Sequence, residues 1–481
     1  MSLKHVKKHS VPIIESFIEE TQLNAFNNTE TRYTFRQSLL AFSSLLQAAC
    51  GGSVLGFSSI LFPQLEESKE IVLTIDQASW IASIPTLVML PVVLSAGWML
   101  GLFGRRLSVI MVFITTLLAW LTTYFANSYE TLFASRFIAG IFVGGAYPVV
   151  VTYMGETTHP RIRAVCLAGV PLGCAVGVLL TQFLGIYLHW RKVALILATF
   201  PIYNLLICSY IKESYIWLLN KNRVDEARRA FVWFRGIDID AKAEFMAALD
   251  SKDNVVAINS SIKEKIKFCF SKAFVMPFLL TALLFLTSEF SGDTALIFYT
   301  SHIIKIITND PEAQYYSNLI LNILRVIATF ASAMLIKRFS IRTVFITTGF
   351  CLACSLANIS LFLYLSGAYP ENKAFPLICL VSVIVNVIFF ALGLGPLPTV
   401  ICGEMYPASV RDIGGALSAF LSFTSLFTIV KLMPHFFVLV NPEFIFLMFA
   451  CCTLTGVTVM CFVLPNTKNK TLKELENFYE A

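Results

Sequence analysis

Apolar runs recur along the whole chain, and each is long enough to cross a lipid bilayer. A transmembrane helix needs about 20 consecutive, mostly apolar residues. Twelve such runs are predicted, at residues 40–64, 78–101, 107–127, 130–154, 164–188, 191–211, 275–304, 314–336, 342–364, 376–402, 412–436 and 442–464. Hydrophobic residues make up 57% of the chain and charged residues only 14%, whereas about a quarter of the residues of a soluble domain are charged. We therefore predict an all-α membrane protein with twelve transmembrane helices.

A polar interval at residues 212–272 separates the first six runs from the last six. It contains the amphipathic stretch KESYIWLLNKNRVDEARRAFVWFRG, a pattern typical of helices that lie outside the membrane. The predicted organisation is an N-terminal tail (1–39), a six-helix bundle (40–211), a helical insert (212–272), a second six-helix bundle (273–464) and a C-terminal tail (465–481).

Lys and Arg gather in the short loops on one side of the predicted membrane. That side holds the insert together with Arg105, Arg106, Arg161, Arg163, Lys337, Arg338, Arg342, Arg411 and Lys468. The other side holds little beyond Lys69, Arg191, Lys192, Lys305 and Lys373. Cytoplasmic loops carry an excess of Lys and Arg, so the first side is predicted to be cytoplasmic and to hold both termini. Because the net charge of +6 arises from such loops, it does not indicate nucleic-acid binding.

The two predicted bundles repeat a charged motif. GETTHPRIR follows the fourth run and GEMYPASVR follows the tenth, so that Glu156 and Glu404 each stand seven residues before an arginine, Arg163 and Arg411. GLFGRRLSVI after the second run has a weaker counterpart, KRFSIRTVFI, after the eighth. Two related halves of six spans are typical of transporters whose substrate site lies near the midplane, between the halves.

On these residues the chain resembles a sugar porter of the major facilitator superfamily, nearest to the insect facilitated trehalose transporter-like branch. The motifs are GRR at 104–106, RFIAG at 136–140, YMGETTHPRIR at 153–163, ESYIWLL at 213–219, EARRAFVWFRG at 226–236, GLGPLP at 393–398, GEMYPASVR at 403–411 and LPNTK at 464–468. The resemblance implies two pseudo-symmetric bundles and facilitative transport of a sugar, such as trehalose or a hexose, across the plasma membrane by alternating access. It implies no enzymatic activity.

Charged residues at the predicted cytoplasmic ends of the spans form a predicted inner gate. The set is Arg105, Arg106, Glu156, Arg163 and Glu213 in the first half, and Arg342, Glu404 and Arg411 in the second. Bridges between the halves must break when the inner side opens, so each should be worth about 1 kcal/mol. If the cations only set the topology, the two repeated glutamates have no explanation. Gly101 replaces an acid of the family pattern, which predicts a thinner gate.

The resemblance also places the sugar pocket, whose usual residues are replaced here. Ser288 and Glu289 stand where span 7 of the family has two Gln, Thr294 where it has Asn, and Arg325 where span 8 has Asn. The predicted substrate-binding residues are Gln182, Ser288, Glu289, Thr294, Phe298, Tyr299, Arg325, Phe390, Thr399 and Ser422, with Phe57 and Ser58 as further candidates. Gln182 has an alternative role, which is to hydrogen-bond a neighbouring helix.

The acid and the base of this pocket are predicted to lie at the same depth. Glu289 lies twelve residues after Pro277 and Arg325 twelve residues before Lys337, which at 1.5 Å per residue puts both about 18 Å from the cytoplasmic boundary. An uncompensated charge at that depth costs roughly 2.5–3.5 kcal/mol. Asp293, one turn beyond Glu289, is predicted to face an outer vestibule.

Several interpretations of the two charges stay open. Glu289 and Arg325 can form an ion pair bridged by sugar hydroxyls, or they can bind a charged substrate. Glu289 can also carry a proton, although proton-coupled relatives usually have an Asp in span 1 where this chain has Ser58. A purely structural salt bridge is the fourth possibility.

Other function classes have little support. The GxxxxGK[ST] nucleotide loop is absent, and most of the twelve cysteines stand in apolar runs without metal-ligand spacing. We therefore expect no cofactor and no metal, and as partners a sugar or related small polar solute and the lipid bilayer. The Gly-Pro stretch GLGPLP should break the helix of span 10. The alternative from another class is a non-transporting sugar sensor.

Overall fold

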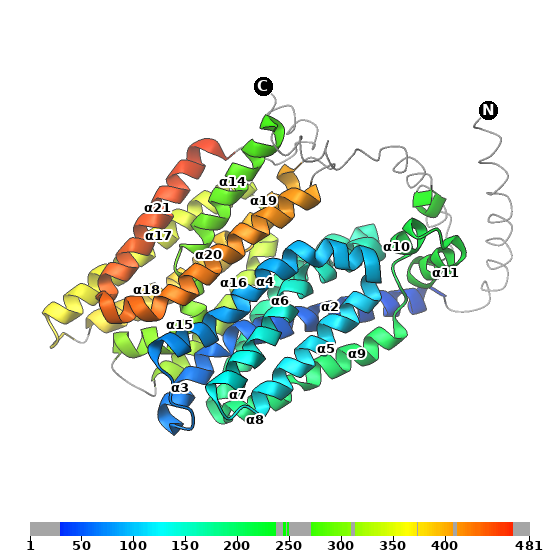
Figure 1. Cartoon of the computed structure of the whole chain (residues 1–481). Coiled ribbons are helices and arrows are strands. Elements are labelled where there is room, and N and C mark those ends of the chain that lie inside the picture. The colour runs from blue at the N-terminus through cyan, green and yellow to red at the C-terminus, as the bar shows by residue number, and fades with distance from the viewer. Residues whose placement is uncertain are drawn as a thin grey trace.

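The computed structural model describes residues 29–236, 244–246, 248–249, 271–308, 313–372, 374–406 and 411–464. All regular structure in these ranges is helical (Figure 1). Twelve stretches are long and apolar enough to cross a membrane, and each overlaps one predicted run. The predicted all-α, twelve-span fold is therefore confirmed.

The first half contains eight helices, of which two pairs form broken spans. Their bounds are α2 (Thr29–Gly56), α3 (Ser58–Ser68), α4 (Ile75–Phe103), α5 (Arg105–Tyr124), α6 (Tyr129–Thr157), α7 (Pro160–Tyr187), α8 (Trp190–Leu197) and α9 (Thr199–Tyr210). The helices α2 and α3 together make span 1, and α8 and α9 make span 6. The insert follows, with α10 (Tyr215–Asn220) and α11 (Val224–Arg235).

The second half has the same number of spans. Its helices are α14 (Lys272–Glu289), α15 (Asp293–Thr308), α16 (Ala313–Arg338), α17 (Ile341–Ala368), α18 (Ala374–Phe389), η1 (Phe390–Leu394), α19 (Leu397–Met405), α20 (Arg411–Leu439) and α21 (Pro442–Val463). Span 7 consists of α14 and α15, and span 10 of α18, η1 and α19. The break in span 10 confirms the prediction from GLGPLP: a π-helical turn precedes Gly395 and Pro396, and proline has no N–H to continue the ladder.

Each half has its own hydrophobic core. One core extends from Leu40 to Phe234 and includes the buried Phe113, Phe142 and Trp190. The other includes the buried Phe345 and Phe449. Between the halves, α4 packs along α20, α7 along α16 and α3 against α15.

The insert helices lie beyond one end of the first bundle (Figure 1), and we call this the insert end and the opposite one the far end. In α11 one face is buried through Ala227, Phe231 and Phe234. Phe231 packs edge-on against Tyr215 of α10, with ring centroids 4.9 Å apart. This small core holds the insert together outside the bundle.

Candidate functional site

Span 7 breaks at the position of its two acids. Helix α14 ends at Glu289 and α15 begins at Asp293. Gly292, between them, has φ +84°, and a Cβ there would lie 3.0 Å from a ring carbon of Phe449. Only glycine combines that backbone conformation with so little space. Because the helix does not continue, the prediction that Asp293 lies one helical turn beyond Glu289 is wrong.

Arg325 of α16 pairs with Asp293 and not with Glu289, which was its partner in one of the interpretations that the sequence left open. The Arg325 guanidinium donates to Asp293 Oδ2 at 2.6 Å. Asp293 is fully buried, so the prediction that it faces an outer vestibule is also wrong. The break after Glu289 is the physical reason, because it turns the first residue of α15 toward α16.

Two polar atoms of this ion pair have no partner among the described protein atoms. They are Asp293 Oδ1 and Arg325 Nε, both buried. A buried pair usually satisfies its remaining donors and acceptors. The pair therefore keeps hydrogen-bonding capacity that a bound solute or water can use.

Glu289 lies at the junction of three helices and is half-buried. Its Oε1 accepts from Ser422 of α20 at 2.8 Å, and its Oε2 accepts from Thr294 of α15 at 2.9 Å. Three of the predicted pocket residues are thus brought together. No cation pairs with Glu289 in the part of the chain that the structure describes.

Ser288 and Tyr299 tie span 7 to its neighbours. Ser288 Oγ donates to the Leu394 carbonyl in the π-turn of span 10, at 2.8 Å. Tyr299 donates to the Val430 carbonyl of α20, also at 2.8 Å, and its φ of −127° marks a kink in α15. Both side chains are buried, so their hydroxyls are already used in helix–helix contacts.

The remaining pocket candidates, Phe298, Phe390 and Thr399, differ in burial and in their contacts. Phe298 is buried beside Tyr299, whose ring is stacked with that of Phe62 across the two halves at 6.5 Å. Phe390 is half-buried in the π-turn, and its carbonyl accepts from Gly395 N. Thr399 is exposed, and its hydroxyl bonds only its own helix, at Pro396. Among the described residues, Phe390 and Thr399 form no hydrogen bond with Glu289, Thr294 or Ser422.

Gln182 joins the two halves. Its Nε2 donates to Ser59 Oγ of α3 at 3.0 Å, and its Oε1 accepts from Asn322 of α16 at 2.5 Å. Asn318, one turn before Asn322, donates to Ser301, which in turn donates to the Ser59 carbonyl. The sequence analysis missed Asn318 and Asn322, although lone amides one turn apart in an apolar span are a recognisable signal.

Arg136 of α6 is buried without an acid partner among the described residues. Its guanidinium donates to Ser58 Oγ at 3.0 Å and to the Val54 carbonyl at 3.3 Å. It also lies over the Phe57 ring, 4.8 Å from the centroid. Ser58 and Phe57 thus both contact a buried cation.

The described side chains of the predicted inner gate contact partners in their own half. Arg105 grips Glu156 through two hydrogen bonds of 2.5 and 2.9 Å. Arg106 donates to the carbonyls of Cys208 and Ser209, which lie in the last turn of α9. In the second half, Arg342 donates to the Cys461 carbonyl at 2.7 Å. In this structure these residues do not bridge the halves, and the bridging expected when the inner side is closed stays a prediction.

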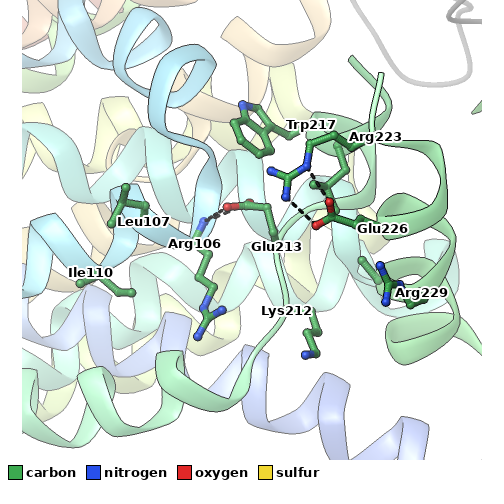
Figure 2. Close-up of a pocket in the computed structure, with 11 residues that line it drawn as sticks. Arg106, Leu107, Ile110, Lys212, Glu213, Trp217, Arg223, Glu226 and Arg229 are labelled. Carbon is green, nitrogen blue, oxygen red and sulfur yellow. Dashed lines mark hydrogen bonds and ion pairs between the residues drawn. The ribbon is translucent and has the colours of Figure 1, made fainter. Parts of the chain in front are cut away.

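Glu213 caps the start of α5 (Figure 2). Its carboxylate accepts from the backbone N–H of Arg105 at 2.8 Å and of Arg106 at 3.1 Å, the first donors of a helix that lack internal partners. Burial raises the pKa of the Glu213 carboxyl above its ordinary value, and these backbone donors oppose the rise. The side chains of Arg163, Glu404 and Arg411 lie outside the described residues.

A pair that sequence reasoning missed joins the halves at the far end. Lys431 of α20 donates to Asp76 Oδ1 of α4 at 2.8 Å and lies over the Trp80 ring. Among the described residues, the side-chain hydrogen bonds and ion pairs between the halves all lie in the far half of the bundle.

Comparisons with known proteins agree on the kind of molecule. Residues 13–479 match the profile of the family described as "Sugar (and other) transporter". The chain is 26% identical to the facilitated trehalose transporter Tret1 of Drosophila grimshawi over 98% of its own length, and spans about half (51%) of that protein. It is 27% identical to Tret1 of Apis mellifera ligustica, over 95% of this chain and 90% of that protein.

Solved structures with the same fold share less sequence. The xylose transporter XylE from E. coli in an inward-open conformation aligns with a TM-score of 0.73 at 17% identity, over 91% of this chain and 99% of that one. The proton:xylose symporter XylE bound to 6-bromo-6-deoxy-D-glucose aligns with a TM-score of 0.72, also at 17% identity, over 92% of this chain and 100% of that one.

Proposed function

Since the chain belongs to the "Sugar (and other) transporter" family, we propose that it is a facilitative transporter of a neutral sugar, such as trehalose or a hexose. It works in the plasma membrane with the insert end in the cytoplasm. The Tret1 relatives support the substrate class, at 26% and 27% identity. The excess of Lys and Arg at the insert end supports the orientation.

The observation that carries this proposal is the partner of Arg325. Because Asp293 already neutralises Arg325 at 2.6 Å, the guanidinium is not free to hold an anionic substrate. Removing Asp293 from a buried pair of this kind costs about 3–5 kcal/mol, so an anion would have to compensate a large loss. A neutral polyol avoids that cost.

Glu289 then supplies the polar contact to the sugar. Its carboxylate is half-buried and accepts two hydroxyls, from Ser422 and Thr294. A carboxylate has about four lone-pair sites, so it keeps capacity for sugar hydroxyls or for exchange of its present partners. The unpartnered Asp293 Oδ1 offers a further acceptor on the adjoining helix.

Uniport is supported by Ser58. Arg136 faces this hydroxyl at 3.0 Å, where proton-coupled relatives carry an Asp. A serine hydroxyl does not titrate in the physiological range, so this position cannot take up a proton with each cycle. Alternating access would then require the far-end contacts, among them Asp76 with Lys431, to break when the far side opens.

A cationic solute is the second candidate, and one observation favours it. Glu289 has no cation partner among the described residues, so an ammonium group could pair with its carboxylate. The family profile is broad enough to include other solutes, as its description states.

Uptake into proteoliposomes distinguishes these proposals. We expect trehalose or glucose to enter down its gradient, and Glu289→Gln to change the half-saturation concentration several-fold. Glu371→Gln removes an exposed acid at a loop and should leave uptake unchanged. Uptake of amines alone, abolished by Glu289→Gln, would establish the cationic candidate. Sugar binding without any flux would contradict transport and support a sensor.

A further inference from the structure

A cavity of about 570 Å³ lies at the insert end, between α5 and the insert helices (Figure 2). It is separate from the Glu289 cluster, and the proposed transport does not use it. Its apolar lining includes Leu107 and Ile110 of α5 and Trp217 of α10. Its charged lining consists of Arg106, Lys212, Glu213, Arg223, Glu226 and Arg229.

The two acids of this cavity are already occupied. Glu213 accepts the backbone N–H groups at the start of α5. Glu226 is held by Arg223 through two hydrogen bonds of 2.8 and 2.6 Å. Neither carboxylate is therefore available to neutralise the other cations.

Three cations of the lining lack a carboxylate partner within the described part of the chain. Lys212 and Arg229 are exposed and form no side-chain hydrogen bond or ion pair there. The Arg106 guanidinium donates to the Cys208 and Ser209 carbonyls and forms no ion pair with a described carboxylate. The lining thus carries four cations against two anions, which favours an anionic ligand.

The apolar side of the cavity belongs to a membrane span. Arg106 is the second residue of α5, and Leu107 and Ile110 lie further into the same span. Leu107 is 44% exposed, so its side chain is free to contact lipid. Trp217, whose indole donates to the Gly101 carbonyl at 3.0 Å, is of the type enriched at membrane interfaces. The charged lining of the cavity therefore adjoins an apolar face of α5, and the two are about one helical turn apart.

We propose that this cavity binds the headgroup of an anionic phospholipid of the cytoplasmic leaflet. Its phosphate lies between Lys212 and Arg229, and an acyl chain follows Leu107 and Ile110. Basic pockets beside transmembrane helices on the cytoplasmic side are suited to such headgroups. Because Leu107 and Ile110 belong to the bundle, whereas Lys212 and Arg229 belong to the insert, the lipid would tie the insert to the bundle.

Native mass spectrometry of the full chain tests this proposal, with phosphatidylserine as the probe and phosphatidylcholine as the neutral comparison. We expect selective binding of phosphatidylserine, weakened on the order of ten-fold by Lys212→Gln/Arg229→Gln. The charge-keeping Lys212→Arg/Arg229→Lys should restore it. The matched control Lys192→Gln/Lys272→Gln removes two exposed cations elsewhere and should bind within two-fold of the wild type.

Three results would overturn the proposal. Equal binding of the two phospholipids would show that the charge is not recognised. Equal binding to the double variant and to its control would place the lipid elsewhere. Competition by soluble glycerophosphoserine as strongly as by phosphatidylserine would show that the cavity takes a soluble phosphate ester and not a lipid.

Discussion

Lys431 of α20 donates to Asp76 of α4 at 2.8 Å and so joins the two halves at the far end of the bundle. The Lys431 carbonyl also accepts from Ser79 of α4 at 2.7 Å, and the Lys431 ammonium lies 4.1 Å from the centre of the Trp80 ring. Lys431 thus contacts three residues within about one turn of α4, namely Asp76, Ser79 and Trp80. Asp76 is exposed, so water screens this pair. A weak contact of this kind suits a bridge that must break in each cycle.

Asp76→Asn should therefore favour opening of the far side. Because this pair is screened by water, its loss should shift the population open to that side by a few-fold at most. We expect the half-saturation concentration for sugar supplied from the far side to fall by up to that factor. Glu70→Gln is the matched control, because Glu70 pairs with Arg191 of its own half at 3.0 Å. Equal half-saturation concentrations for Asp76→Asn and Glu70→Gln would contradict a role of the Asp76–Lys431 pair in keeping the far side closed.

Removal of the buried acid should destabilise the second half. Asp293→Asn leaves Arg325 buried without a counter-charge, and such losses cost about 3–5 kcal/mol. We expect a clear fall in the Tm of the purified protein, partly recovered in Asp293→Asn/Arg325→Gln because both charges are then gone. Asp76→Asn, at an exposed acid, should shift the Tm far less. A double variant less stable than the single one would refute the pairing.

Gly292→Ala should damage the break in span 7. The φ of +84° disfavours any side chain, and the new Cβ would lie 3.0 Å from Phe449. The expected loss is about 1–2 kcal/mol, measured as a lower Tm and weaker sugar binding. Gly51→Ala is the control, since it lies within α2 and a Cβ there meets nothing within 4 Å. Equal effects of the two changes would show that the break is not specific to glycine.

Glu213 should make stability depend on pH. Burial raises the pKa of its carboxyl, so the folded protein binds this proton more tightly than the unfolded chain. Its contribution to stability is full below the ordinary pKa of 4.5 and is lost as the pH rises through the raised value. We expect the wild type to lose stability relative to Glu213→Gln over that interval, measured by thermal unfolding. The opposite slope would mean that the backbone donors outweigh burial.

The exposed Glu371→Gln corrects that comparison for general effects of charge. If the pH dependence of stability still differs between the wild type and Glu213→Gln after this correction, the difference arises from the Glu213 cap of α5.

The sequence predicted the fold well because a bilayer demands long apolar helices and little else. It did not identify Asp293 as the partner of Arg325, because counting along span 7 assumes one continuous helix, whereas the helix breaks at Gly292, between Glu289 and Asp293. The contact of Arg105 with Glu156 inside one half was likewise not readable. Charges at helix ends can pair within a half or between halves, and the choice depends on packing angles that a single sequence does not encode.

The cluster of Glu289, Thr294 and Ser422 was predictable as a set, because the family frame aligns those positions in the pocket. The geometry of the cluster was not predictable, because the two partners of Glu289 lie on other helices, Thr294 on α15 and Ser422 on α20. Asn318 and Asn322 are lone amides in an apolar span, a signal that the sequence contains, but they lie outside the family motif from which the pocket residues are predicted.

Ser58→Asp should make transport sensitive to pH. Arg136 is buried, and its nearest side-chain partner is Ser58 at 3.0 Å, so an Asp there would form a buried pair whose protonation changes with conformation. An acid beside an arginine favours the charged form while burial favours the neutral one, and a cycle that alters burial would then move a proton. We expect an inward proton gradient to accumulate sugar in vesicles holding Ser58→Asp, but only to equilibrate it with the wild type. Ser58→Asn, nearly the same in shape but not titratable, is the matched control. Accumulation by the Asn variant, or its absence in an Asp variant that still equilibrates sugar, would show that the hydroxyl facing Arg136 does not determine the coupling.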